Sequence, residues 1–153
     1  MSNATHFRAR AIARLRAAMI YWIATTRPDG RPHSMPVWGV WVDGALWFGT
    51  YGQKVRNLEH EAYAVAHLES GEDVAIVEGP VERLALTDAP AAVVAAYREK
   101  YVDPTTGEPF ELQAAAEPGD DSWLYMLRPR VGHAWVEGAY LETQTRWTSG
   151  DGA

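Results

Sequence analysis

Apolar and polar residues alternate along most of this chain with the two-residue period of half-buried β-strands. Runs of this kind, and short apolar runs, are bounded by turn residues and predict seven strands. The predicted strands span residues 20–26, 31–42, 45–50, 62–69, 74–86, 123–127 and 131–136. The segment Tyr140–Trp147 is predicted to add one more short extended piece.

The residues between these strands are those of tight turns. Arg27–Gly30 and Asp43–Gly44 supply glycine where a chain reversal needs positive φ, so the first three strands should fold back on one another. Pro32 and Pro36 cannot donate to a β-ladder, and the second strand is therefore expected at a sheet edge or with a bulge. Gly79-Pro80 predicts a bulge in the fifth strand.

Helical spacing of apolar residues marks the remaining segments. The predicted helices cover residues 7–19, 53–60, about 88–101 and, within a Pro-, Gly- and acid-rich loop at 103–121, about 110–116. Thr5 is predicted to cap the first helix, whose arginines are expected on a solvated face, and Thr87 or Asp88 to cap the third. The pattern as a whole predicts a mostly β fold: an antiparallel β-barrel of six to seven strands with peripheral helices.

Length and composition add a domain count and exclude several classes of partner. The 153 residues predict a single domain over residues 1–153, with its core at about 7–147 and a disordered tail beyond Trp147. A net charge of −6 argues against nucleic acid as a partner, and no apolar run approaches the ~20 residues of a membrane span. The amino end lacks a secretory signal, so we expect a cytoplasmic protein that does not bind membranes.

Signatures of several enzyme classes are missing from the sequence. It has no cysteine, no Gly-rich dinucleotide fingerprint, no phosphate loop, no nucleophile elbow and no zinc-binding helix. The closest approach to a metal pattern is His60 and His67, but a predicted helix-to-strand break separates them. We therefore expect no metal site, and the catalytic residues stay unassigned.

The segment that follows the third strand carries a candidate anion site. Residues 52–58 (GQKVRNL) place Lys54 and Arg56 at a predicted helix start, where backbone N–H groups and two cations converge on one point. This arrangement suits a phosphate group. The alternative is that both cations belong to a solvated helix face.

Several short motifs, taken in order, resemble those of the pyridoxamine 5′-phosphate oxidase-like split β-barrel superfamily. They are residues 24–32 (ATTRPDGRP), 35–38 (MPVW), 54–58 (KVRNL), 77–79 (VEG) and 128–135 (RPRVGHAW). The closing Thr145-Arg146-Trp147 is similar to the ending of one bacterial branch. The resemblance covers nearly the whole chain from Tyr21 to Trp147.

The resemblance implies a split β-barrel and a homodimer with two cofactor sites at the subunit interface, each holding FMN or the deazaflavin coenzyme F-420. By the family pattern, Met35, Pro36, Val37 and Trp38 would face the ring of the cofactor. The other implied cofactor-binding residues are Thr50, Gln53, Lys54, Arg56 and Asn57 at the phosphate, and Trp135 and Arg146 reaching across from the other subunit. Only Arg146 remains of a basic substrate-phosphate set, which argues against vitamin B6 oxidation itself.

Three functional hypotheses follow. The first is an FMN- or deazaflavin-dependent oxidoreductase that transfers hydride to or from a small organic substrate. The second is a non-catalytic carrier or sensor of a flavin, haem or other planar ligand on the same barrel. The third is a structural dimer with a vestigial cleft, in which Trp38, Trp41 and Trp47 fill the core and Trp135 packs against the other subunit. The chain's acidity favours FMN, whereas its Met-Pro-Val-Trp strand favours the deazaflavin.

Overall fold

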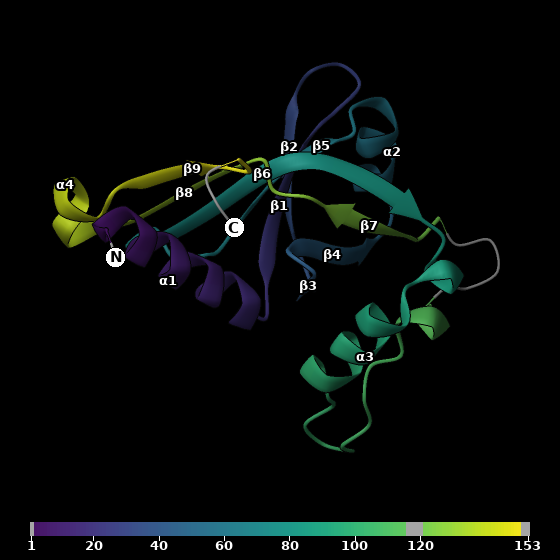
Figure 1. The fold of residues 1–153 in the computed structure, drawn as a ribbon. Coiled ribbons are helices and arrows are strands. Elements are labelled where there is room, and N and C mark those ends of the chain that lie inside the picture. The colour runs from purple at the N-terminus through teal and green to yellow at the C-terminus, as the bar shows by residue number, and fades with distance from the viewer. Residues whose placement is uncertain (1, 116–120, 151–153) are drawn as a thin grey trace.

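The computed structural model describes residues 2–115 and 121–150, which fold into one antiparallel sheet system with helices around it (Figure 1). The strands of the described residues are β1 (Tyr21–Thr26), β2 (Pro32–Val37), β3 (Val40–Val42), β4 (Ala45–Thr50), β5 (Tyr63–His67), β6 (Asp73–Leu84), β7 (Trp123–Leu127), β8 (Val131–Val136) and β9 (Thr145–Thr148). The α-helices are α1 (Asn3–Ala17), α2 (Gln53–His60), α3 (Ala91–Lys100) and α4 (Tyr140–Thr143), and the 3-10 turns are η1 (Leu86–Asp88), η2 (Leu112–Ala115) and η3 (Glu137–Ala139).

The sheet runs in the order β2-β1-β5-β6-β7-β4-β3, and every pair is antiparallel. The 12-residue strand β6 belongs to both halves of this curled sheet, as Figure 1 shows. Its first half pairs with β8, which carries β9, and its last four residues pair with β7. The mostly β, split-barrel fold class predicted from the sequence is thereby confirmed.

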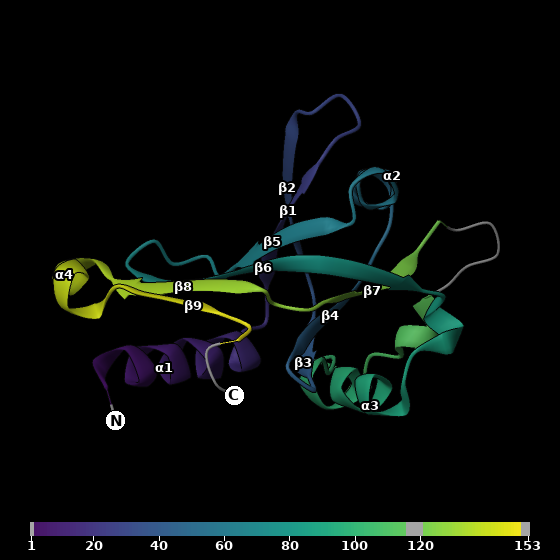
Figure 2. The same cartoon turned by 45° about the horizontal axis from the view of Figure 1, so that its top comes forward.

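Two groups of buried side chains form the core. One lies between α1 and the strands around β6 and includes Leu15, Tyr21 and Phe48. The other lies between α3 and the sheet and includes Trp47 and Tyr97. In both views α1 runs beside β8 and β9, while α3 lies at the opposite end of the molecule next to β3 and β4 (Figures 1 and 2).

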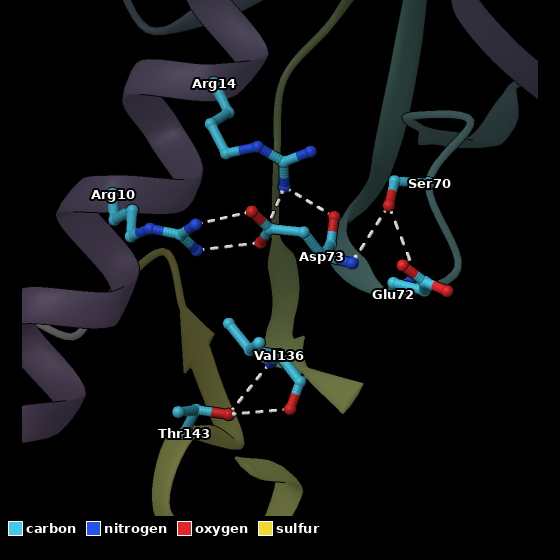
Figure 3. A network of polar contacts seen from close by, with 7 residues as sticks. All are labelled: Arg10, Arg14, Ser70, Glu72, Asp73, Val136 and Thr143. Atoms are coloured by element: carbon cyan, nitrogen blue, oxygen red, sulfur yellow. Dashed lines mark hydrogen bonds and ion pairs between the residues drawn. The ribbon is translucent and has the colours of Figure 1, made fainter. Parts of the chain in front are cut away.

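Polar contacts at the start of β6 attach α1 to the sheet (Figure 3). Arg10 donates to the Asp73 carboxylate at 2.7 Å, and Arg14 approaches the same carboxylate at 3.0 Å. The Arg10 hydrogen bond is the main reason that the pKa of Asp73 is lowered. These two arginines were expected on a solvated face; they instead pair with the sheet.

The boundaries of several elements differ from the prediction. The segment predicted as one strand, residues 31–42, is divided into β2 and β3 at Trp38-Gly39. The extended piece predicted over Tyr140–Trp147 is confined to its end, as β9, since Tyr140–Thr143 form α4. The described residues contain nine strands in all. Gly79-Pro80 forms no break, because both residues pair with β5. On the other side of β6 the partner changes here, since pairing with β8 ends at Glu78 and pairing with β7 begins at Val81.

The helix ends differ in the same way. The α1 helix begins earlier than predicted, since Ser2 is its N-cap and accepts the N–H of Thr5. The α3 helix begins after Pro90, and Thr87 and Asp88 lie in η1. Residue 116 of the predicted short helix, and residues 151–153 of the predicted disordered tail, lie outside the described residues. No helix of the described chain is both long and apolar enough to span a bilayer.

Candidate functional site

A cleft of about 570 Å³ opens where the end of β2, the end of β4 and the first turn of α2 meet the α3 region. Six of the eleven residues implied as cofactor contacts line it: Met35, Pro36, Val37, Trp38, Thr50 and Lys54. The structure therefore brings the Pro-interrupted strand and the cationic helix start to one cavity, although about 15 residues separate them in sequence.

Strand β4 delivers Lys54 to this cleft through a sharp turn. The strand ends at the buried Thr50, and Gly52 then adopts a positive φ of 72° before α2 begins. The N–H of Gly52 points toward the Asp121 carboxylate at 3.3 Å, so a negative group of the chain itself already lies at the helix start.

Lys54 is partly buried at the cleft and has no ion-pair partner in the described part of the chain. Burial lowers the pKa of its ammonium group. The pKa of His33 is lowered by burial and further by the positive charges of Arg27 and Lys54. Within the described residues, Nδ1 of His33 is buried without a hydrogen-bond partner. His33 does not line the cleft, whereas Lys54 does, and the unpaired ammonium group of Lys54 makes this end of the cleft suitable for an anionic group.

The opposite wall is aromatic and apolar. Trp38 stacks on Tyr101 with ring centroids 4.6 Å apart and planes 2° apart, and meets Phe110 edge-on at 5.4 Å. Met35 and Trp38 are 45% and 47% exposed, so their apolar surface is open to a ligand. A flat, apolar ring system could pack against such a wall without losing hydrogen bonds.

Three other implied contacts, Gln53, Arg56 and Asn57, turn away from the cleft and bond to one another. The Asn57 amide donates to Thr25 Oγ1 at 2.9 Å and accepts from Gln53 Nε2 at 2.7 Å. Arg56 in turn donates to Gln53 Oε1 at 3.0 Å. This chain of hydrogen bonds ties α2 to β1, and Asn57 is completely buried in it. The three side chains do not line the cavity in this chain.

Trp135 and Arg146 lie on β8 and β9, of which β8 pairs with the first half of β6 (Figure 1). Trp135 donates from Nε1 to the Glu137 carboxylate at 3.2 Å and packs edge-on against Tyr140. Neither residue lines the cleft of its own chain. Their contact with a cofactor bound to a second subunit stays a prediction.

One wall of the cleft, which comes from the α3 region, was not predicted from the sequence. Leu86, Tyr97, Phe110 and Leu112 all line the cleft, and Tyr51 lies at its rim. An available signal was the pair of tyrosines at 97 and 101, since two aromatic residues four apart on a helix form one face. Their role depends on packing against β3 and β4, which a local pattern does not reveal.

The side chains of the cleft offer little acid–base chemistry of their own. Its titratable lining residues are Tyr51, Lys54 and Tyr97, and burial strongly raises the pKa of Tyr97. Among the described lining residues there is no carboxylate and no histidine. Across residues 2–115 and 121–150, no group of three His, Asp or Glu side chains is arranged to hold a metal ion.

Comparison with protein-family models and with curated proteins finds no match. Comparison with solved structures finds 71 similar chains. An F-420 reductase has a TM-score of 0.55 and 23% identity, over 78% of this chain and 93% of that chain. A pyridoxamine 5′-phosphate oxidase-related, FMN-binding protein from Nostoc punctiforme has a TM-score of 0.57 and 19% identity, over 94% and 85%.

A haem-binding protein from Mycobacterium smegmatis has a TM-score of 0.66 and 23% identity; the match covers 97% of this chain but 58% of that chain. Identities below 25% establish the fold alone. At that level the resemblance stated from the sequence motifs is confirmed: this chain has the split β-barrel fold of the pyridoxamine 5′-phosphate oxidase-like superfamily.

Proposed function

We propose that the cleft binds FMN or the deazaflavin coenzyme F-420, and that the protein is an oxidoreductase for a small organic substrate. The observation that carries this proposal is the pairing of an uncompensated Lys54 with an exposed apolar wall at Met35 and Trp38 in a single cleft. An anionic ligand with a flat ring satisfies both ends of that cleft. Its volume lies within the roughly 300–1,000 Å³ of small-molecule sites.

The residues present fit such a group. Lys54 would hold the phosphate, and its lack of an ion-pair partner among the described residues supports this assignment. The Gly52 N–H at the helix start is already directed at the Asp121 carboxylate. Met35, Pro36, Val37 and Trp38 would hold the ring. A bound flavin or deazaflavin supplies hydride transfer, while the protein orients it and excludes water. The lack of an acid–base pair in the cleft is consistent with that division of roles.

The second candidate is a carrier or sensor that binds a planar ligand without turnover. Two observations favour this candidate: the similarity in fold to a haem-binding protein, and the small number of acid–base groups among the described residues that line the cleft. Haem is the weaker choice of ligand, because no histidine is found among the described residues that line the cavity.

The test begins with the absorption spectrum of the purified protein and with titrations of FMN, coenzyme F-420 and haemin. We expect the Lys54→Ala variant to bind FMN or F-420 about 10- to 100-fold more weakly, as loss of one charge-assisted bond predicts. Arg56→Ala is the matched control, because it removes a cation two residues away whose side chain does not line the cleft. Equal losses in the two variants, or none in either, would contradict the assignment of Lys54.

Turnover needs a separate measurement. Bound reduced cofactor should be reoxidised faster when an organic acceptor is added than in anaerobic buffer alone. Tight cofactor binding without any such acceleration, over a panel of apolar acceptors, would favour the carrier hypothesis.

A further inference from the structure

A second cavity, of about 640 Å³, lies on the other side of Trp38. It is bounded by Met19, by the end of α3 at Tyr101 and by the segment from Val102 to Glu111. It shares two aromatic side chains, Trp38 and Phe110, with the cleft described above. A molecule in the second cavity would therefore contact the same indole that forms the wall of the first.

The partition between the two cavities is held firmly by α3. Trp38 and Gly39 lie between β2 and β3, outside the sheet ladder, and α3 side chains bond their backbone instead. Tyr97 donates to the Trp38 carbonyl at 3.2 Å, and Lys100 donates to the Gly39 carbonyl at 2.7 Å. Tyr101 accepts the Gly39 N–H at 2.8 Å while it stacks on the indole. The indole is thus preorganised as a wall.

The outer wall is also ordered by hydrogen bonds. The N–H of Asp103 donates to the Glu108 carbonyl at 2.9 Å, and the N–H of Phe110 donates to the Tyr101 carbonyl at 2.8 Å. The Asp103 carboxylate accepts the N–H groups of Thr105 and Thr106 at 2.7 and 3.1 Å. This segment therefore closes into a fixed loop, so the cavity exists before any ligand binds.

The charge of the second cavity is opposite to that of the first. Its lining contains Asp103, Glu108 and Glu111, and no lysine, arginine or histidine is among its described lining residues. Asp103 is used by the loop and Glu111 pairs with Arg98. Glu108 has no hydrogen-bond or ion-pair partner for its carboxylate in the described part of the chain. It is exposed, so it gives the cavity an unpaired negative charge that solvent partly screens.

We propose that the second cavity is a ligand site separate from the cofactor cleft, for a planar apolar molecule that is neutral or positively charged. The chemical preference rests on the cavity alone, since Trp38, which borders both cavities, keeps a ligand of the second out of contact with a ring bound in the first. Apolar side chains such as Met19, Val102 and Phe110 form most of the surface, and Met19 and Val102 are 49% and 48% exposed. The unpaired Glu108 disfavours an anion and attracts a cation.

Three probes of one shape test the preference: 1-naphthylmethylammonium, 1-naphthalenemethanol and 1-naphthoate. Their binding is measured by equilibrium dialysis with the full chain, both in the Lys54→Ala variant and in wild-type protein saturated with FMN. Removing or filling the cationic end of the first cleft prevents naphthoate from binding there. We expect the ammonium probe to bind about two- to fivefold more tightly than the neutral probe, as an exposed carboxylate allows, and naphthoate to bind the weakest.

Two variants locate the binding. Glu108→Gln should abolish the advantage of the ammonium probe. Glu99→Gln should keep that advantage, because Glu99 is an exposed carboxylate on α3 that lines neither cavity. Val102→Arg places a cation at the rim and should reverse the order of the ammonium and naphthoate probes. Thermal unfolding of each variant confirms that it is folded.

Each outcome decides between the alternatives. The proposal is overturned if no probe binds, as would happen if a second subunit filled the cavity, or if naphthoate binds as well as the ammonium. It is also overturned if FMN displaces the ammonium probe, or if Glu99→Gln matters as much as Glu108→Gln. Failure of FMN and F-420 to bind, with the probe order intact in Lys54→Ala, would refute the proposed function and leave the cavity's preference standing.

Discussion

Two polar residues of the same short helix have opposite surroundings. Lys54, in the first turn of α2, has no counter-charge in the described part of the chain, whereas Asn57, one turn later, is completely buried and bonded to Thr25 and Gln53. A buried amide without partners costs free energy, so these bonds are needed for the helix to dock on β1. Asn57 therefore supports the position of Lys54 from inside the protein.

We predict that Asn57→Ala lowers the free energy of unfolding by about 1–3 kcal/mol, because Thr25 Oγ1 and the Gln53 amide lose their buried partner. The measurement is urea denaturation followed by tryptophan fluorescence. Arg56→Ala, at an exposed position of the same helix, should change stability by less than about 0.5 kcal/mol. A variant of Asn57 with full stability but no cofactor affinity would instead favour the direct cofactor contact that the family resemblance implies.

At the residue scale, the sequence could predict which segments carry the site but not which way each side chain points. The order of short motifs grouped Met35–Trp38 with Lys54, and these residues line one cleft. It also grouped Gln53, Arg56 and Asn57 with the phosphate, and in this chain those side chains bond to one another. The direction of a side chain around a two-turn helix depends on how the helix packs, and that is set by strand β1, some 30 residues earlier.

At the scale of elements, the close approach of separate segments decides where glycine is required. Strand β6 passes the connection between β7 and β8 at Gly79, where an added Cβ would lie 2.0 Å from the Arg128 carbonyl oxygen. The backbone of that connection bonds to β6, since Arg130 donates to the Glu78 carbonyl at 2.7 Å. Gly79, from which the sequence predicted a bulge, thus allows the connection between β7 and β8 to cross closely over β6.

We predict that Gly79→Ala destabilises the protein by about 3 kcal/mol or more, because the clash is with backbone atoms that cannot rotate away. Gly71→Ala is the control: it lies in the turn before β6 with no atom within 4 Å of its added Cβ, and its stability should stay within about 0.5 kcal/mol of the wild type. The midpoints of urea denaturation compare the two. Similar midpoints for the two variants would mean that the backbone around Arg128 can move to make room for a Cβ at position 79.

The elements that the sequence predicted best are those set by local chemistry. The limits of α2 and β4 match the prediction, because a Gly turn separates a short apolar run from a helical one. The division between β2 and β3 could not be foreseen, since Tyr97, Lys100 and Tyr101 hold that break from about 60 residues away. Contacts at such a distance leave no periodic signal in the segment they alter.

On the scale of the whole molecule, exposed apolar side chains are gathered on one region. Eight large hydrophobic residues are exposed in the described chain, and six of them line the two cavities: Met19, Ile20, Met35, Trp38, Tyr51 and Val102. The other two, Tyr140 and Leu141, lie on α4 at the far end of the molecule (Figure 1). Contiguous apolar surface of this kind is typical of an interaction site. The fold class was predictable from strand pattern and turn residues, whereas this surface arises only when distant segments meet.

We predict that the protein is a dimer of 17.0-kDa chains that pair through the rim of the first cleft, with Trp135 and Arg146 of each chain facing the cofactor of the other. Ile20→Glu adds a charge to that rim, where Ile20 is 41% exposed, and should convert the dimer to monomers because a charge without a partner is costly to bury. It should also weaken FMN binding, since each site would lose the residues of the second chain. Light scattering coupled to gel filtration measures the mass.

Leu141→Glu is the control, because Leu141 is 80% exposed on α4 and lines neither cavity. A protein that is monomeric as wild type, or a dimer that dissociates with Leu141→Glu and persists with Ile20→Glu, would rule out assembly through this face.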